Sequence, residues 1–97
     1  MAKQIKWSVR ANQDRLEILD YWIKRNQSNS YSIKLDSLFR ENIELLAQIP
    51  ALGKPTDFPN VRIKIVRDYS IFYRITDQFL EIITIWDSRR NPEKLKL

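Results

Sequence analysis

Three of the four prolines and the only glycine of this 97-residue chain lie between positions 50 and 59. Proline lacks a backbone donor and both residue types interrupt regular elements, so this segment predicts a loop that divides the chain. The residues before it have helical periodicity, and the residues after it alternate as strands do. The sequence has no internal repeat, low-complexity tract or Gly/Ser linker, so we expect one domain over residues 1–97.

The first half predicts a short strand and a helical hairpin. Apolar and polar residues alternate near the N-terminus, which predicts a strand over 3–9. From 12 to about 25 the apolar residues fall on one helical arc, and Asn12 or its neighbour is the expected cap. A polar break at 26–30 follows. The next helix should run to about Ile49, because Pro50 cannot continue it.

The second half predicts three strands joined by short turns. Alternating residues mark strands over 61–65 and 69–75, and the last strand, from 79 to about 86, is apolar at both parities. Such a strand is typical of the centre of a sheet that is covered on both faces. Short turns require antiparallel pairing. The predicted fold class is therefore α+β, with the order β-α-α-β-β-β and the helices packed on one face of the sheet.

The period of two along a strand also predicts a cationic face. If the apolar residues Val61, Ile63 and Ile65 point toward the helices, the alternate residues of both strands share the opposite, open face: Arg62, Lys64, Ser70, Phe72 and Arg74. Arg89 and Arg90 follow the last strand, and the amphipathic tail at 93–97 can fold back at the sheet's margin. Such a surface would bind phosphate or an acidic partner. The alternative is that each cation is an ordinary solvated strand residue.

Composition excludes several classes of function. The chain has neither cysteine nor histidine, which excludes disulfides, thiol nucleophiles and the usual zinc ligands, so we expect no metal and no cofactor. Any catalysis would need lysine, arginine, tyrosine or carboxylates. The net charge of +5 raises the expectation of a polyanionic or acidic partner. Because the N-terminus has no apolar core and no long apolar stretch follows, we expect a cytoplasmic protein without a membrane partner.

The chain resembles the RelE/ParE superfamily of toxins from type II toxin–antitoxin, or plasmid stabilisation, systems. The resemblance covers nearly the whole chain and rests on the element order together with Trp7, Ala11, LAQIPALG at 46–53, RDYSIFYRI at 67–75 and the run Arg89-Arg90-Asn91-Pro92. It implies a small basic toxin that inhibits growth until a cognate antitoxin protein wraps around it. It also implies a fold related to small microbial ribonucleases.

Two mechanisms are known in the superfamily, and the resemblance implies residues for each. RelE-like toxins cleave messenger RNA on the ribosome, and Arg62, Lys64 and Arg89 match their catalytic positions. Ser70 stands where those toxins have an arginine, and Leu95 lies about where many have a tyrosine. Cleavage by the 2′-hydroxyl needs a base, an acid and cations, and an arginine is always charged and a poor proton carrier.

ParE-like toxins inhibit DNA gyrase without cleavage chemistry, and the run at 69–74 is similar to theirs, so gyrase inhibition is the favoured interpretation. In either mechanism Arg62, Lys64, Arg74, Arg89 and Arg90 would bind the phosphate or the target. Ile18, Tyr21 and Leu95 are the candidate antitoxin contacts, because a small core does not need all of its apolar groups. A non-enzymatic nucleic-acid-binding module on the same fold is a further alternative.

Overall fold

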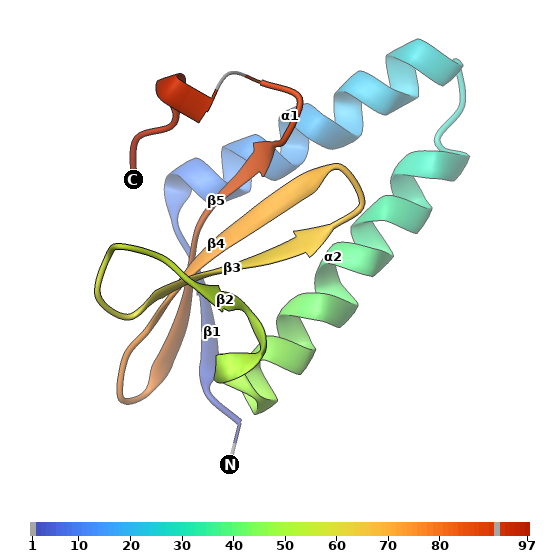
Figure 1. The fold of residues 1–97 in the computed structure, drawn as a ribbon. Coiled ribbons are helices and arrows are strands. Elements are labelled where there is room, and N and C mark those ends of the chain that lie inside the picture. The colour runs from blue at the N-terminus through green and yellow to red at the C-terminus, as the bar shows by residue number, and fades with distance from the viewer. Residues whose placement is uncertain (1, 91) are drawn as a thin grey trace.

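The computed structural model describes residues 2–90 and 92–97 (Figure 1). Its elements, in chain order, are β1 (Gln4–Trp7), α1 (Val9–Asn26), α2 (Ser30–Gln48), β2 (Lys54–Pro55), β3 (Val61–Val66), β4 (Tyr69–Ile75) and β5 (Phe79–Asp87). Short 3-10 turns cover Pro50–Leu52 and Pro92–Lys94. Asn91, part of the run used for the resemblance, lies outside the described residues. None of the described helices combines the length and the apolar character that a bilayer crossing requires.

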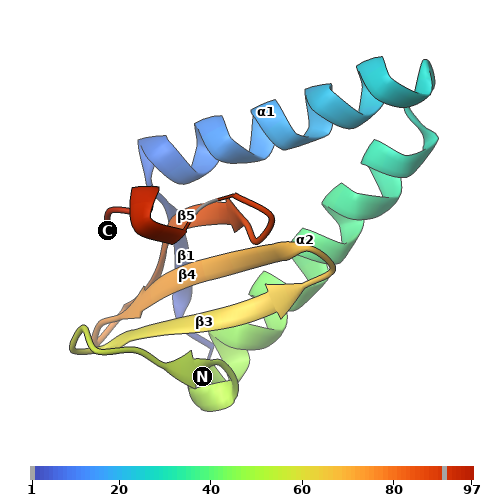
Figure 2. The same ribbon diagram turned by 45° about the horizontal axis from the view of Figure 1, so that its top comes forward.

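One mixed sheet carries the fold, with the strand order β1-β5-β4-β3-β2. The meander β3-β4-β5 is antiparallel, as its short turns require, and β5 lies inside the sheet. The N-terminal strand lies beside the last one (Figure 2). The two strands are parallel, because the helical hairpin returns the chain to the other end of the sheet, and Gln4 pairs with Phe79 and Trp7 with Ile82. The predicted α+β class and element order are confirmed. The brief β2 was not predicted.

Ser8 sets the start of α1 earlier than the sequence suggested. Its hydroxyl accepts a hydrogen bond from the Ala11 N–H at 2.9 Å and donates one to the Ile83 carbonyl at 2.7 Å. The expected strand over 3–9 is therefore too long, and the cap is not Asn12, which already lies in the helix. The second helix ends at Gln48, before Pro50, as expected.

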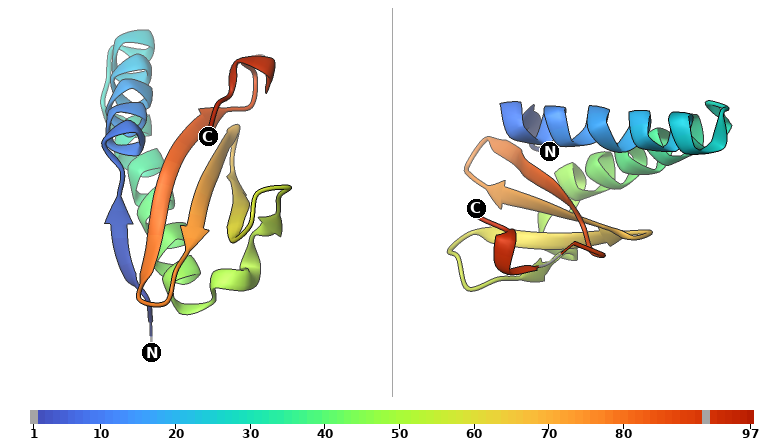
Figure 3. Two further views of the ribbon diagram at one scale, coloured as in Figure 1. Left: turned by 90° about the vertical axis from the view of Figure 1, so that its left-hand side faces the viewer. Right: turned by 90° about the horizontal axis from the view of Figure 1, so that it is seen from above.

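The main core lies between the helical hairpin and one face of the sheet. Phe39 and Leu46 of α2 pack there with Ile71 and Tyr73 of β4, and all four side chains are fully or almost fully buried. The two helices cover this face together, and the hairpin tip projects past the strands (Figure 3). Trp22 of α1 closes the far end of this core, where its indole N–H donates to the Tyr69 hydroxyl at 2.8 Å.

A second apolar cluster lies on the other face of the sheet, and it corrects the face assignment. Its members are Val61, Ile63, Phe72, Ile83 and Trp86 of the sheet together with Leu95 of the tail. Because cross-strand partners share a face, Arg62 beside Tyr73 and Lys64 beside Ile71 belong to the helix side. The expected orientation of β3 is therefore wrong. The tail folds back as expected, and Leu95 packs on this outer cluster.

Candidate functional site

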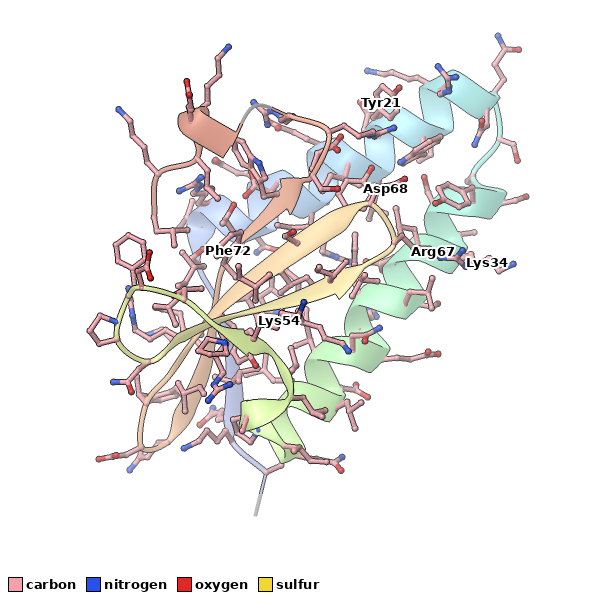
Figure 4. The ribbon with its side chains drawn as sticks, viewed as in Figure 1. Tyr21, Lys34, Lys54, Arg67, Asp68 and Phe72 are labelled. Carbon is pink, nitrogen blue, oxygen red and sulfur yellow. The ribbon has the colours of Figure 1, made fainter. Side chains whose placement is uncertain are left out.

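A groove of about 320 Å³ opens between α1 and the end of β5. Its walls come from α1, from β4 and β5, and from the turn after β5, and its lining residues are Asp14, Glu17, Ile18, Tyr21, Tyr69, Ile85, Asp87, Arg89 and Arg90. Figure 4 marks Tyr21 on α1, near the turn that follows β5. This end of the molecule therefore combines apolar walls with charges of both signs.

Arg89 is held by Asp87 at the mouth of the groove. Its Nε and Nη2 atoms donate to the two carboxylate oxygens at 3.0 and 2.8 Å, and its backbone N–H donates to Oδ1 at 2.9 Å. These hydrogen bonds lower the pKa of Asp87 and raise the pKa of Arg89, so both groups are charged over the whole neutral range. The guanidinium lies 5.8 Å from the centre of the Trp22 ring. Arg89 thus faces α1.

Arg90 lines the same groove, and its guanidinium also reaches an aromatic ring of β5. Its guanidinium lies 4.7 Å from the centre of the Trp86 ring, and Trp86 belongs to the outer cluster. Stacking on an aromatic face leaves the positive charge available to a ligand. Two arginines adjacent in sequence therefore stack on aromatic rings of α1 and of β5.

Two of the three candidate antitoxin contacts line this groove. Ile18 is half-buried against the main core, whereas Tyr21 is 47% exposed, and both face the groove with Arg89 and Arg90. Leu95 packs with Val61 and Phe72 on the outer face and does not line the groove.

The predicted cations do not share one face. Arg62 Nη1 donates to the carbonyls of Ala51 at 3.3 Å and Gly53 at 2.7 Å, so this side chain ties β3 to the loop after α2. Arg74, the cross-strand partner of Val61, lies on the outer face and pairs with Glu81 at 3.2 Å. The expectation of a single cationic face that includes Arg62, Lys64 and Arg74 is therefore corrected.

Two acidic residues that α1 contributes to the groove were missed in the sequence. The Asp14 carboxylate accepts hydrogen bonds from the Thr84 hydroxyl and, at 3.3 Å, from the Ile85 N–H. Glu17 also lines the groove, and no hydrogen bond or ion pair of its side chain is found in the described part of the chain. The spacing of Asp14 between Ala11 and Ile18 on the inner arc of α1 was the available signal, because residues three and four apart share a helix face.

Residues 5–92 match the family of ParE toxins of type II toxin–antitoxin systems, parDE. A solved structure described as the chromosomal ParDE TA system from P. aeruginosa superposes with a TM-score of 0.75 at 22% sequence identity, over 87% of this chain and 94% of that chain. That degree of identity shows a common fold. No curated protein matches the chain significantly.

Proposed function

The chain belongs to the ParE toxin family of type II toxin–antitoxin systems, and we propose that it inhibits DNA gyrase until a cognate antitoxin neutralises it. The family match over residues 5–92 is the observation that carries the proposal. Gyrase inhibition requires a binding surface and no bond-breaking groups. The arrangement of the cations supports this choice.

The residues that would serve RNA cleavage come from, or directly follow, two strands that are not neighbours in the sheet. Arg62 and Lys64 belong to β3, whereas Arg89 follows β5, and β4 runs between these two strands. The Nη1 atom of Arg62 donates to main-chain carbonyls, and Arg89 is engaged with Asp87. A 2′-hydroxyl attack needs a base, an acid and cations around one phosphate. This separation favours a protein target.

We propose that Arg89 and Arg90 contact the target, because they stand together at the end of the last strand with exposed side chains. Ile18 and Tyr21 are proposed antitoxin contacts in the groove beside them. Leu95 is a proposed contact on the outer face. In this arrangement an antitoxin in the groove would cover the target-binding arginines as well.

The decisive experiment compares two activities of the same purified chain. We expect it to block supercoiling of relaxed plasmid by gyrase, and we expect the antitoxin encoded beside its gene to restore supercoiling. In cells, induction should arrest replication and trigger DNA-damage signalling. Primer extension on an abundant messenger serves as the opposing measurement: cleavage ends within codons, with gyrase unaffected, would establish the RelE-like mechanism instead.

The toxin assignment itself has a simpler test. Expression of the chain alone should slow growth, and co-expression of the neighbouring short open reading frame should restore it. A chain that leaves growth unchanged and has no small partner gene beside it would contradict the toxin–antitoxin function.

A further inference from the structure

The end of β5 presents a free strand edge to the groove. β1 accompanies β5 only from Phe79 to Ile82, and at Ser8 the chain turns into α1. Between the β4 partners Phe72 and Tyr73 the register shifts, so Ile83 is an extra residue in β5. Such a bulge exchanges the sides to which the later main-chain groups point. Beyond it, no strand covers β5 on the side of α1 in the described sheet.

Hydrogen bonds on both sides of β5 identify the groups on that edge. The Ser88 N–H points toward β4, where it donates to the Asp68 carbonyl at 2.8 Å. Because main-chain groups alternate along an antiparallel pair, Ile85 and Asp87 point the other way, toward α1. The Ile85 N–H donates to Asp14, and the Asp87 carbonyl accepts from the Arg90 N–H at 3.0 Å. The Ile85 carbonyl and the Asp87 N–H remain without a hydrogen-bond partner among residues 2–90 and 92–97.

We propose that an extended segment of the antitoxin pairs with this edge as an added strand, parallel to β5. The inference rests on the proposed function, in which the antitoxin covers Arg89 and Arg90. Main-chain groups on a strand edge bind extended chain, and this edge lies in a groove with apolar side walls. The added strand would continue the line of β1, which is itself parallel to β5.

The direction follows from which groups are free. In a parallel ladder one partner residue bonds the carbonyl of one residue and the N–H two positions later, which is the pair that Ile85 and Asp87 offer. An antiparallel partner bonds both groups of the same residue. Asp14 has taken the Ile85 N–H, and Arg90 has taken the Asp87 carbonyl, so each antiparallel pair would be half made.

The charges around the edge specify the side chains of the segment. Glu17 on α1 and Arg90 beyond β5 form no ion pair with another described residue, in contrast to Arg89 and Asp87. Ile18 and Ile85 form apolar walls near the middle. The fitting segment therefore has an apolar residue between Ile18 and Ile85, a basic side chain opposite Glu17, and an acidic group further along, toward Arg90.

Amide hydrogen exchange tests the pairing without any substitution. In the complex with the antitoxin encoded beside the gene, we expect exchange at the Asp87 N–H to slow by at least roughly tenfold. The Ile65 N–H is the matched control, because it lies on the opposite free edge of the same sheet, beyond β2, and should not change. Tight binding with unchanged exchange at Asp87 overturns the added strand and leaves the proposed function intact. If the antitoxin does not bind the chain at all, both the added strand and the proposed function are contradicted.

Charge reversal on the groove walls is the second measurement. Glu17→Lys and Arg90→Glu should each weaken antitoxin binding by roughly tenfold or more, whereas Glu41→Lys, the same change on an exposed position of α2, should leave it unchanged. If all three variants bind the antitoxin with equal affinity, the predicted position of the segment in the groove is wrong. A different result is that exchange at the Asp87 N–H slows without antitoxin, and more so at higher protein concentration. That result would assign the edge to a second copy of this chain and would also overturn the inference.

Discussion

Arg89 and Asp87 form a two-pronged ion pair with N···O distances of 3.0 and 2.8 Å, and the carboxylate comes only two residues before the guanidinium. The pair fixes the direction of the Arg89 side chain and offsets its charge at the point where β5 ends. Arg90, which stacks on Trp86, has no comparable carboxylate in the described chain. Both arginines are positively charged, but only the charge of Arg89 is offset by an ion pair in the part of the chain that the structure describes.

Replacement of Arg90 should reduce toxicity more than replacement of Arg89. We expect Arg90→Ala to restore most of the growth of induced cells. Arg89→Ala should restore less, because Asp87 already offsets the charge of Arg89. Both positions are exposed, so the free energy of unfolding should change by no more than about 0.5 kcal/mol. Growth after induction is the measurement, with Arg25→Ala at the end of α1 as the control. An inverse order of the two arginines would contradict this prediction.

Arg62 should prove structural. Its guanidinium donates to the Gly53 carbonyl at 2.7 Å, so Arg62→Ala should lower the free energy of unfolding by about 1 kcal/mol, the typical net contribution of one hydrogen bond. Lys64→Ala should leave stability unchanged. Denaturant unfolding measures both. In a gyrase inhibitor neither variant should lose toxicity at a temperature where it is folded, whereas loss of toxicity in both folded variants would favour messenger cleavage.

Asp36 should stabilise the helical hairpin in a pH-dependent way. The hydrogen bond from Arg15 at 2.6 Å lowers the pKa of Asp36 in the folded chain, so its contribution is present above the unfolded pKa of about 3.9 and is lost as the pH falls through the lower folded value. Asp36→Asn should cost about 1–2 kcal/mol at pH 7. The difference from wild type should shrink below about pH 4. Asp20→Asn, which breaks only the exposed pair with Lys24, is the control. A difference that stays constant down to acid pH would refute the assigned ion pair.

The Tyr73 hydroxyl should anchor the loop after α2. It accepts a hydrogen bond from the Gly53 N–H at 2.9 Å and donates one to the Pro50 carbonyl at 2.6 Å. Tyr73→Phe leaves both groups unpaired in a buried place and should cost about 1–3 kcal/mol. Tyr31→Phe is the matched control, because no hydrogen bond of the Tyr31 hydroxyl is found in the described chain. Thermal unfolding distinguishes the two, and equal midpoints would contradict the anchor.

Gly53 should be intolerant of a side chain. A Cβ atom there would collide with the Tyr73 hydroxyl and lie 2.8 Å from the Ile63 carbonyl oxygen, and the latter is backbone that cannot move aside. Gly53→Ala should therefore lower the midpoint of thermal unfolding by several degrees, as expected from a loss of about 1 kcal/mol or more. Combining Gly53→Ala with Tyr73→Phe should relieve only the clash with the hydroxyl, because the clash with the Ile63 carbonyl remains. No destabilisation in the single variant would show that the strand can shift.

The order of elements was predictable because periodicity and turn chemistry are local. Pro50 ends α2, and the pair Arg67-Asp68 forms the two-residue turn between β3 and β4, with Arg67 at a φ of 58°. The apolar residues of β5 at both parities indicated its place inside the sheet, and it lies between β1 and β4. Each of these inferences used neighbouring residues only.

The orientation of β3 was not predictable from alternation. Val61 and Ile63 are apolar, yet they pack under the tail residue Leu95 on the outer face, and Arg62 lies on the helix side at the sheet margin. A period of two separates two faces without saying which one the helices cover. The groove was hidden for a related reason: it depends on the bulge at Ile83 and on Asp14, which meet only when α1 crosses β5.

The pairing of β1 with β5 also constrains how the toxin is made on the ribosome. β1 is the first strand to be synthesised, and its neighbour in the sheet is the last, so Ser8 must wait for the Ile83 carbonyl, 75 positions later. The hairpin of α1 and α2 and the pair β3-β4 have local contacts and can form during elongation. The main core, however, includes Leu80, Ile82 and Ile85 of β5. A message cut or stalled before those codons therefore yields a nascent chain that cannot complete its core.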